Sequence, residues 1–249
     1  MKQIKMRLDQ ALVERGLAES RAKAQAAIMA GLVFSGEKRL DKPGQPVAAD
    51  APLEMRGKPH PWVSRGGIKL AHGLQHFGFP VAGRICIDIG ASTGGFTDVL
   101  LQNGAAKVYA VDVGEGQLDW RLRNDARVVV LEKTNARHIS AEQIPDAISA
   151  IVCDASFIGL KTVLPAALAL AKPGAWAIAL IKPQFEVGRE RVGKGGVVRD
   201  SALHEEVCDD IRAWWSSLPG WSVRDIETSP ITGPEGNIEF LIGAEFSDA

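Results

Sequence analysis

Two polar side chains that could exchange a proton each follow a run of apolar residues. Asp154 comes directly after Ile151-Val152-Cys153, and Lys182 comes directly after Leu180-Ile181. If both runs form neighbouring parallel strands, their carboxyl ends meet at one edge of the sheet and bring the two side chains together. Burial favours the neutral form of a lysine and a nearby carboxylate favours its charged form, so the sequence leaves the resting state of Lys182 open. The pair predicts a site at which a lysine takes a proton from a bound group.

Two further charged residues, Lys69 and Glu239, are expected near this pair. Lys69 lies in a predicted helix before the first strand, and Glu239 lies in the last predicted strand. Lys69 could stabilise negative charge that develops on a reacting oxygen, and Glu239 could orient either lysine. Taken singly, each could equally be an ordinary surface charge.

A glycine-rich loop lies between the first predicted strand and the next helix, in Asp88-Ile89-Gly90-Ala91-Ser92-Thr93-Gly94-Gly95-Phe96-Thr97. Glycines let backbone N–H groups turn toward a ligand at the start of a helix. Ser92 stands where the dinucleotide fingerprint requires its second glycine, and no Lys-Ser or Lys-Thr completes a P-loop. The acidic Asp88 would repel a phosphate, but it suits the cationic amine and sulfonium of S-adenosylmethionine. The loop therefore favours this cofactor; in the alternative interpretation its glycines only make a tight turn.

Residues after the second and third strands extend the expected cofactor site. Asp112 closes the second strand, where a carboxylate can accept hydrogen bonds from the ribose of S-adenosylmethionine or of NAD. Asn135 follows the third strand and could address the adenine edge, or could only cap a local turn. The residues expected to bind the cofactor are Ser64, Asp88, Gly90, Ser92, Thr93, Gly94, Gly95, Phe96, Asp112, Val113, Asn135 and Asp154.

Strands and helices alternate from residue 84 onward, which favours an α/β sheet covered on both faces. The expected strands are Arg84–Ile89, Lys107–Asp112, Val128–Leu131, Ser149–Asp154, Ala175–Lys182, Ser222–Glu227 and Ile238–Ala244. The expected helices are Gly95–Asn103, Gln117–Arg123, Leu160–Ala171 and Ser201–Ser217. Only a loop joins the last two strands, so they could pair antiparallel at the sheet edge. With the cofactor loop, this pattern predicts a Rossmann-like class I methyltransferase domain with a seven-stranded, mostly parallel sheet.

The first part of the chain differs in pattern and in charge. Residues 1–70 carry 13 Lys and Arg against 7 Asp and Glu, whereas residues 71–249 carry 16 against 23. Short helical and strand patterns predict a small α+β domain, and its basic charge suggests a polyanionic partner. The prolines of Gly57–Pro61 disfavour a helix and indicate a linker. We expect a basic domain over residues 1–57, a linker over 58–63 and the α/β domain over 64–249.

Basic residues that could contact such a polyanion occur in both domains. The segment Arg189–Arg199 combines four basic residues with glycines, so it could order over the ligand or simply be a mobile loop. In the plainer interpretation the basic residues only form a solvated face. The residues expected to make the contact are Arg7, Arg21, Lys23, Lys38, Arg39 and Arg65.

The four charged residues introduced first resemble the catalytic set of a known family. In their order along the chain they are similar to the K-D-K-E tetrad of the FtsJ-like ribose 2′-O-methyltransferases: Lys69, Asp154, Lys182 and Glu239.

The resemblance extends beyond the tetrad to nearly the whole chain. Arg7–Leu12 and Ser20–Ala24 resemble a small RNA-binding domain first described in a ribosomal small-subunit protein. That domain followed by an FtsJ-like methyltransferase is the arrangement of the TlyA family. Further segments similar to that family are Ser64–Gly67, Cys153–Phe157 and Lys182–Glu186.

This resemblance implies an S-adenosylmethionine-dependent enzyme that methylates a ribose 2′-hydroxyl of ribosomal RNA, typically of a cytidine. The implied partners are ribosomal RNA or ribosomal subunits in the cytoplasm, and family members also carry a historical haemolysin label. The residue types agree with this chemistry, because a ribose hydroxyl is a poor nucleophile until its proton leaves. Lys182, if neutral, could accept that proton, and Asp154 could position the hydroxyl or the lysine.

Other methyltransferase classes fit the sequence less well. An amino- or base-N-methyltransferase more often has Asn/Asp-Pro-Pro-aromatic after the fourth strand, where this chain has Asp154-Ala155-Ser156-Phe157. A cytosine-carbon methyltransferase needs a nucleophilic thiol, but Cys153 and Asp154 should face opposite ways in a strand. A catalytically silent RNA-binding or ribosome-assembly factor stays as the alternative, against which the four tetrad-type residues argue.

Composition argues against a membrane or a metal partner. No run of about 18 apolar residues and no signal-peptide pattern occurs, so a membrane-lytic protein is the weakest option. Cys86, Cys153 and Cys208 lack metal-ligand spacing and indicate inert packing in a reducing cytoplasm. The modified nucleotide, the ribosomal subunit and the oligomeric state are left open.

Overall fold

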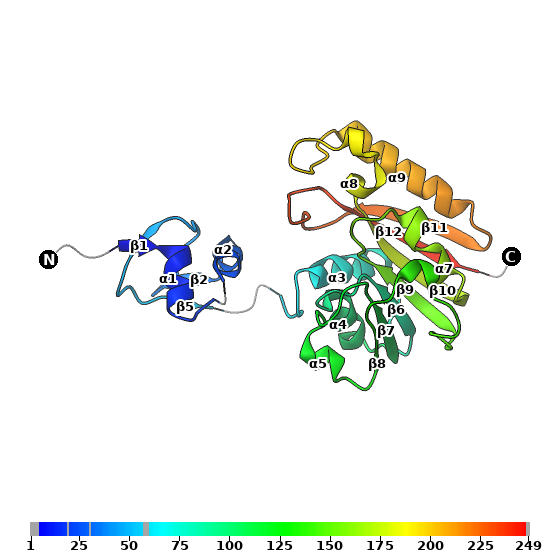
Figure 1. The fold of residues 1–249 in the computed structure, drawn as a ribbon, viewed down its shortest axis with the longest axis horizontal. Helices are drawn as coiled ribbons and strands as arrows, with labels where there is room; N and C mark the ends of the chain where they lie inside the picture. Colours follow the sequence, from blue (N-terminus) through cyan, green and yellow to red (C-terminus); the bar gives the residue numbers. More distant parts are fainter. Residues whose placement is uncertain (1–4, 19, 30, 57–59, 248–249) are drawn as a thin grey trace. The chain divides into compact units, whose positions relative to one another are not determined.

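The computed structural model describes residues 5–18, 20–29, 31–56 and 60–247. The chain forms two compact units, Met1–Pro61 and Trp62–Ala249, because most contacts between residues fall within one unit or the other (Figure 1). Each unit has its own core of buried apolar residues. The first two residues of the expected linker, 58 and 59, lie outside the described residues, as does residue 57 before them.

The first unit is a small α+β domain, as predicted. Two helices, α1 (Leu8–Glu14) and α2 (Arg21–Met29), pack together. β1 (Lys5–Arg7) pairs antiparallel with β4 (Pro46–Ala48), and β2 (Val33–Ser35) pairs antiparallel with β3 (Lys38–Arg39) and β5 (Glu54–Met55). The apolar residues spaced along both helices meet in one core, which contains Leu8, Ala11, Leu12, Ala24, Ala27, Ile28 and Val33.

The second unit is built on a seven-stranded sheet in the order β11-β12-β10-β9-β6-β7-β8. Its strands are β6 (Ile85–Ile89), β7 (Lys107–Val111), β8 (Val128–Leu131), β9 (Ile148–Cys153), β10 (Ala171–Ile181), β11 (Trp221–Thr228) and β12 (Phe240–Phe246). β12 runs antiparallel to both of its neighbours, whereas the pairs from β10 to β8 are parallel. The predicted mostly parallel sheet with an antiparallel last pair is confirmed.

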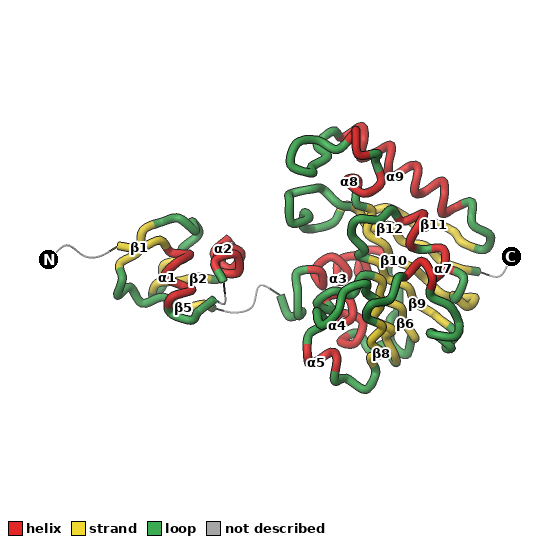
Figure 2. Tube along the Cα trace, in the orientation of Figure 1, coloured by secondary structure: helices red, strands yellow, loops and turns green. Residues whose placement is uncertain are grey.

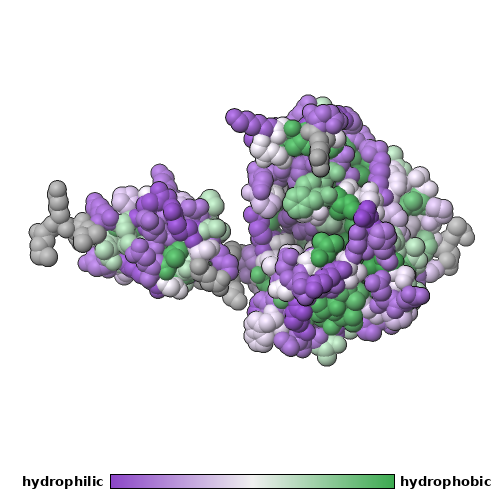
Figure 3. Space-filling model, viewed as in Figure 1, coloured by the Kyte–Doolittle hydropathy of each residue, from purple (hydrophilic) through white to green (hydrophobic). Residues whose placement is uncertain are grey.

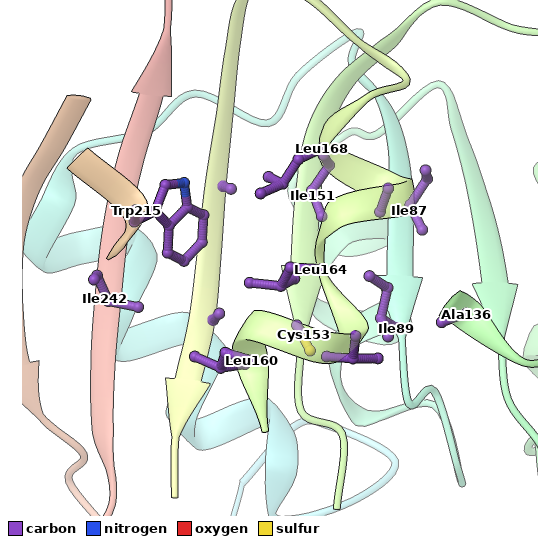
Figure 4. Packing of buried hydrophobic residues seen from close by; sticks show 14 of the residues in the cluster. Ile87, Ile89, Ala136, Ile151, Cys153, Leu160, Leu164, Leu168, Trp215 and Ile242 are labelled. Atoms are coloured by element: carbon purple, nitrogen blue, oxygen red, sulfur yellow. The ribbon is translucent and has the colours of Figure 1, made fainter. Parts of the chain in front are cut away.

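Helices cover both faces of this sheet (Figure 2). One face packs against α3 (Gly66–Phe77), α4 (Gly95–Gln102) and α5 (Trp120–Arg123). The other packs against α6 (Leu160–Val163), α7 (Pro165–Leu168) and α9 (Ser201–Ser216). Alternate residues of β9 pack on opposite faces of the sheet. Val152 belongs to the core on the first face, whereas Ile151 and Cys153 belong to the core on the second (Figure 4). Three short helices remain, α8 (Pro183–Glu186), η1 (Ala136–His138) and η2 (Arg189–Arg191).

The expected helix Leu160–Ala171 is wrong in its extent. The chain forms two short helices, α6 and α7, and Ala171 already begins β10. Pro165 lacks an N–H and its ring crowds the preceding turn, so the helix cannot continue unbroken through it. The apolar pattern gave no sign of this break.

Two other predicted ends are also corrected. α5 begins at Trp120 instead of Gln117, because the Asp119 side chain caps it by accepting a hydrogen bond from the Arg121 N–H. β12 begins at Phe240 instead of Ile238, so Glu239 lies directly before the strand. The glycine-containing turn at 233–237 occupies the preceding residues.

The surface of both units is largely hydrophilic on the face shown in Figure 3, with hydrophobic residues in separate patches. Within the described ranges, every helix is too short or too polar to cross a membrane.

Candidate active site

A cavity of about 470 Å³ opens beside the carboxyl ends of β6, β9 and β10. In an open α/β sheet this edge is where ligands bind, close to the strand from which the chain order diverges. β6 is that strand here, because it pairs with β7 on one side and with β9 on the other. The walls come from Gly196 and from five segments: residues 64–69, the loop at 90–96, and residues 154–157, 182–185 and 233–239.

The glycine-rich loop fits tightly between its neighbours. Gly90 has a φ of 78°, and a Cβ there would lie 2.9 Å from the Cα of Ala155. A Cβ on Gly95 would lie 2.3 Å from the Oγ of Ser64. Glycine is therefore required at both positions, since any side chain would push the loop away from the residues that follow β9 and precede α3. This close approach lets the backbone of the loop line the cavity.

Asp88 lies beneath the loop and does not reach the cavity. Its side chain is fully buried and accepts a 2.6 Å hydrogen bond from Thr97 Oγ1, whereas Oδ1 has no hydrogen-bond partner among the described residues. Burial raises the pKa of this carboxyl to about 7, against the lowering effect of the Thr97 hydrogen bond. Asp88 is therefore placed to support the loop from beneath, and it does not contact the cavity in which the cofactor would bind.

Asp112 organises the start of the next loop. Its Oδ2 accepts from the Ser92 N–H at 2.8 Å and its Oδ1 accepts from the Gly114 N–H at 2.7 Å. With Ser92 it borders a smaller hollow beside the main cavity. Each carboxylate oxygen keeps a second lone pair, so the group can still accept hydrogen bonds from a diol.

The remaining cofactor candidates divide into two groups. Asn135 caps η1 by accepting from the Arg137 N–H at 3.1 Å, and it borders neither hollow. Val113 is exposed, and Gly94 faces Leu118 and Leu122 of the core. The predicted residues that do line the main cavity are Ser64, Gly90, Ser92, Thr93, Gly95, Phe96 and Asp154.

The four charged residues expected to act together form one connected chain in the cavity. Glu239 Oε2 lies 2.6 Å from Lys69 Nζ, which lies 3.7 Å from Asp154 Oδ2. Asp154 Oδ1 in turn lies 2.6 Å from Lys182 Nζ. The side chains of Glu239 and both lysines are at least nine-tenths buried, so their charges are balanced pairwise out of bulk water. The structure thus brings together residues that are far apart in the sequence.

Strand ends position this chain of charges. Asp154 directly follows β9 and Lys182 directly follows β10, two parallel neighbours in the sheet. Lys69 is contributed by the first turn of α3, and Glu239 by the residue before β12. The Lys182 amine also donates to the Asp154 carbonyl at 3.1 Å and to Ser156 Oγ at 3.0 Å.

Several cavity residues were not predicted individually. Ser156 and Phe157 follow Asp154, and Phe185 follows Lys182, so all three lie in segments whose family likeness was noted. Phe157 is 90% exposed, has a φ of 66°, and its ring centroid lies 5.1 Å from that of Phe185. No pattern marked Asn237, which is 2% exposed and holds two loops together through its amide.

The arrangement argues against a nucleophilic cysteine. Cys153 points into the core on the face opposite Asp154, between Leu160, Leu164 and Ile89 (Figure 4). Burial raises the pKa of its thiol to about 12, so the reactive thiolate is suppressed. Cys153 and Asp154 therefore face opposite ways, as predicted.

Basic residues expected to contact RNA lie in both units. In the first unit, Arg7 binds Asp9 through two hydrogen bonds and Arg21 binds the same carboxylate at 3.0 Å. The hydrogen bond from Arg7 contributes most to holding the pKa of Asp9 well below its usual range. Lys23, Lys38 and Arg39 are exposed. In the second unit, exposed Arg65 borders the cavity and donates to the Thr232 carbonyl.

The cavity and the smaller hollow beside it suit a cofactor with a diol and a cationic centre. Glycines leave room where a Cβ would clash, Asp112 offers a carboxylate at the smaller hollow, and the Asp154 carboxylate lines the cavity itself. Within residues 5–18, 20–29, 31–56 and 60–247, no group of three or more His, Cys, Asp or Glu side chains is arranged to hold a metal ion.

Comparison with known proteins agrees with this description. The model of the FtsJ-like methyltransferase family matches residues 62–246, and the S4 domain model matches residues 6–51. The chain is 52% identical to YqxC of Bacillus subtilis, over 96% of this chain and 85% of that protein. It is 47% identical to the 16S/23S rRNA (cytidine-2′-O)-methyltransferase TlyA of Mycobacterium tuberculosis, over 95% of this chain and 88% of that protein.

A solved structure shares the architecture of both units. It is a protein from Streptococcus thermophilus described as a candidate hemolysin, with a TM-score of 0.77 and 45% identity, covering 98% of this chain and 90% of that one. Two family models in series, high identity over nearly the whole length and a shared fold lead to one conclusion. The chain belongs to the TlyA family, in which an S4 domain precedes an FtsJ-like methyltransferase domain.

Proposed function

We propose that this protein transfers a methyl group from S-adenosylmethionine to a ribose 2′-hydroxyl of ribosomal RNA, at a cytidine. The observation that carries the proposal is the connected chain Glu239–Lys69–Asp154–Lys182 inside the cavity beside the glycine-rich loop. The M. tuberculosis relative named for this activity supports the choice of substrate.

The loop and its surroundings would hold the cofactor. S-adenosylmethionine, when bound, supplies a methyl group on a positively charged sulfur. Asp112 would accept hydrogen bonds from its ribose, and the loop backbone between Gly90 and Gly95 would approach it closely. Asp154 would attract the positive charge from the side of the reacting group.

The tetrad residues would prepare the hydroxyl. Lys182 would accept its proton, a contribution of general base catalysis worth about 10²- to 10⁴-fold. Asp154 lies between the two lysines and would fix Lys182 in place. Lys69, held by Glu239 at 2.6 Å, would stabilise the negative charge that grows on the oxygen.

Basic residues of the S4 domain and an aromatic residue at the cavity would bind RNA. Arginines and lysines of the S4 domain would contact phosphates, which positions an RNA without reading its sequence. Phe157, with its ring exposed at the cavity, offers a face on which a nucleobase can stack.

The experiment that tests the proposal measures methyl transfer from labelled S-adenosylmethionine to ribosomal subunits from a strain that lacks the enzyme. We expect labelled rRNA whose modified linkage resists alkaline cleavage, because 2′-O-methylation removes the attacking hydroxyl. Label without a resistant linkage would move the target to a base. Cofactor binding without transfer to either subunit, naked rRNA or tRNA would favour the silent RNA-binding factor.

A further inference from the structure

The base of the proposed reaction is largely buried at the cavity wall. Lys182 and Ser156 both line the cavity, but Lys182 is 6% exposed, whereas Ser156, which accepts a hydrogen bond from its Nζ, is exposed. Nζ donates hydrogen bonds to the Asp154 carbonyl at 3.1 Å and to Ser156 Oγ at 3.0 Å, and Asp154 Oδ1 lies 2.6 Å away as its ion-pair partner. A substrate oxygen that contacted the lysine directly would compete with these oxygens.

The three oxygens differ in what they can do when the lysine loses a proton. The carboxylate and the carbonyl of Asp154 can only accept, so they can hold the two N–H groups of a neutral amine but not its lone pair. The Ser156 hydroxyl can accept from an ammonium and, after rotation, donate to an amine. Ser156 is thus the partner that suits both protonation states, and it is an exposed residue of the cavity lining.

We propose that Ser156 relays the proton of the attacking hydroxyl to Lys182; this step rests on the proposed function. With Lys182 neutral, Ser156 Oγ donates to Nζ and accepts from the ribose 2′-hydroxyl. As the 2′-oxygen bonds to the methyl carbon, the carbon–sulfur bond breaks and sulfur keeps the electron pair. The hydroxyl proton passes to Ser156 Oγ, the serine proton passes to Lys182 Nζ, and the lysine ends as an ammonium held by its three oxygens. Ser156 is regenerated in the same step.

Three variants of the full-length protein test the relay. Ser156→Ala removes the hydroxyl, Ser156→Thr keeps it, and Ser217→Ala, after α9, is the matched control. The rate of methyl transfer is measured in a single turnover, in mixtures of H₂O and D₂O, and cofactor dissociation constants are measured by calorimetry. We expect Ser156→Ala to lower the rate at least about tenfold, with Thr and the control within a few-fold of the wild type. The cofactor dissociation constant should stay the same throughout.

The isotope dependence separates a relay from a structural role. Two protons moving together give a curved dependence of rate on the D₂O fraction in the wild type, and the Ala variant should give a straight line. A straight line in the wild type, equal loss in the Ala and Thr variants, or an Ala variant within twofold of the wild type would each overturn the relay. Failure of the wild type to methylate ribose would instead remove the proposed function, and the relay with it.

Discussion

The two lysines of the cavity, Lys69 and Lys182, differ in the groups that contact their amines. Lys69 has a carboxylate of its own, Glu239, at 2.6 Å, and a second one at 3.7 Å. Lys182 shares its carboxylate, Asp154, with Lys69, and its other contacts are to uncharged oxygens. Lys69 is therefore the more fully paired of the two cations, which agrees with its proposed role in stabilising negative charge on the reacting oxygen.

The residue-scale test of this assignment is Lys182→Arg. Arginine keeps the positive charge but cannot give up a proton in a protein, so transfer should fall at least about 100-fold while cofactor binding persists. Single-turnover transfer and calorimetric binding check both expectations. Lys172→Arg, an exposed position in β10, serves as the control and should retain full activity. Substantial transfer by Lys182→Arg would exclude the lysine as the base.

Asp88 should make stability depend on pH. An unfolded aspartate ionises near pH 4, so between about pH 4 and pH 7 the folded protein holds a proton that the unfolded chain has lost. The stability from this group is full at low pH and is lost as the pH rises through about 7. Asp88→Asn removes this titration, so its stability relative to the wild type should increase by about 3 kcal/mol between pH 5 and pH 8.

Urea unfolding of both proteins at the two pH values measures this difference, in which unrelated titrations cancel. Asp209→Asn, on the exposed side of α9, is the control and should keep a constant difference from the wild type. Parallel pH dependence of the Asp88→Asn variant and the wild type would contradict the raised pKa.

At the scale of elements, one amide joins two loops at the rim of the cavity. Asn237 accepts from the Val198 N–H at 3.0 Å and donates to the Gly196 carbonyl at 2.9 Å. It therefore attaches the glycine-rich part of Arg189–Arg199 to the segment that carries Glu239. Arg189–Arg199 was expected either to order over RNA or to be mobile. The Asn237 amide attaches the second half of Arg189–Arg199 to the cavity wall.

Asn237→Ala should loosen that wall. We expect faster proteolysis between residues 193 and 199, and a lower rate of transfer, because two buried hydrogen bonds are lost at a cost of about 1–3 kcal/mol. Limited proteolysis followed by mass spectrometry locates the cleavage. Asn103→Ala, which loses a single local hydrogen bond at the end of α4, should show no such cleavage. Equal proteolysis of the Asn237→Ala variant and the wild type would show that the loop is held by other contacts.

Elements also show where a sequence is informative and where it is not. The carboxyl ends of β9 and β10 were predicted to within one residue, because a run of apolar residues followed by a charged one, Asp154 or Lys182, stands out in the sequence. The break at Pro165 and the shift of Glu239 to the residue before β12 were missed, because hydrophobic periodicity does not mark exact ends. The relay position of Ser156 depends on distances across the sheet edge, which only the folded chain supplies.

At the scale of the whole molecule, charge separates the two units. Residues 1–61 carry 11 Lys and Arg against 7 Asp and Glu, whereas residues 62–249 carry 18 against 23, so the S4 domain should carry much of the electrostatic attraction to RNA. The larger domain pairs many of its own cations with carboxylates, as in Arg127–Asp125 and Arg191–Glu206. Composition predicted this division, whereas these ion pairs became visible only in the structure.

Charge reversal in the S4 domain tests that division. Lys38→Glu combined with Arg39→Glu, on β3, should weaken RNA binding and reduce its dependence on salt concentration, because each phosphate contact releases counterions. Binding measured at several salt concentrations gives the slope, and calorimetry should show unchanged cofactor affinity. The control is Lys172→Glu in the other unit. An unaltered salt slope in the double variant would exclude β3 from the RNA contact.

The position of β12 between β10 and β11 has a consequence for biosynthesis. β11 leaves the ribosome before β12 but pairs with no other strand of the described chain, so it must wait for the later strand before it can join the sheet. Glu239, which completes the chain of charges, leaves the ribosome directly before that strand. With the proposed site, a nascent chain should therefore be inactive until β12 is inserted, and translation that stops before Glu239 yields a protein that lacks both this strand and the fourth charged residue.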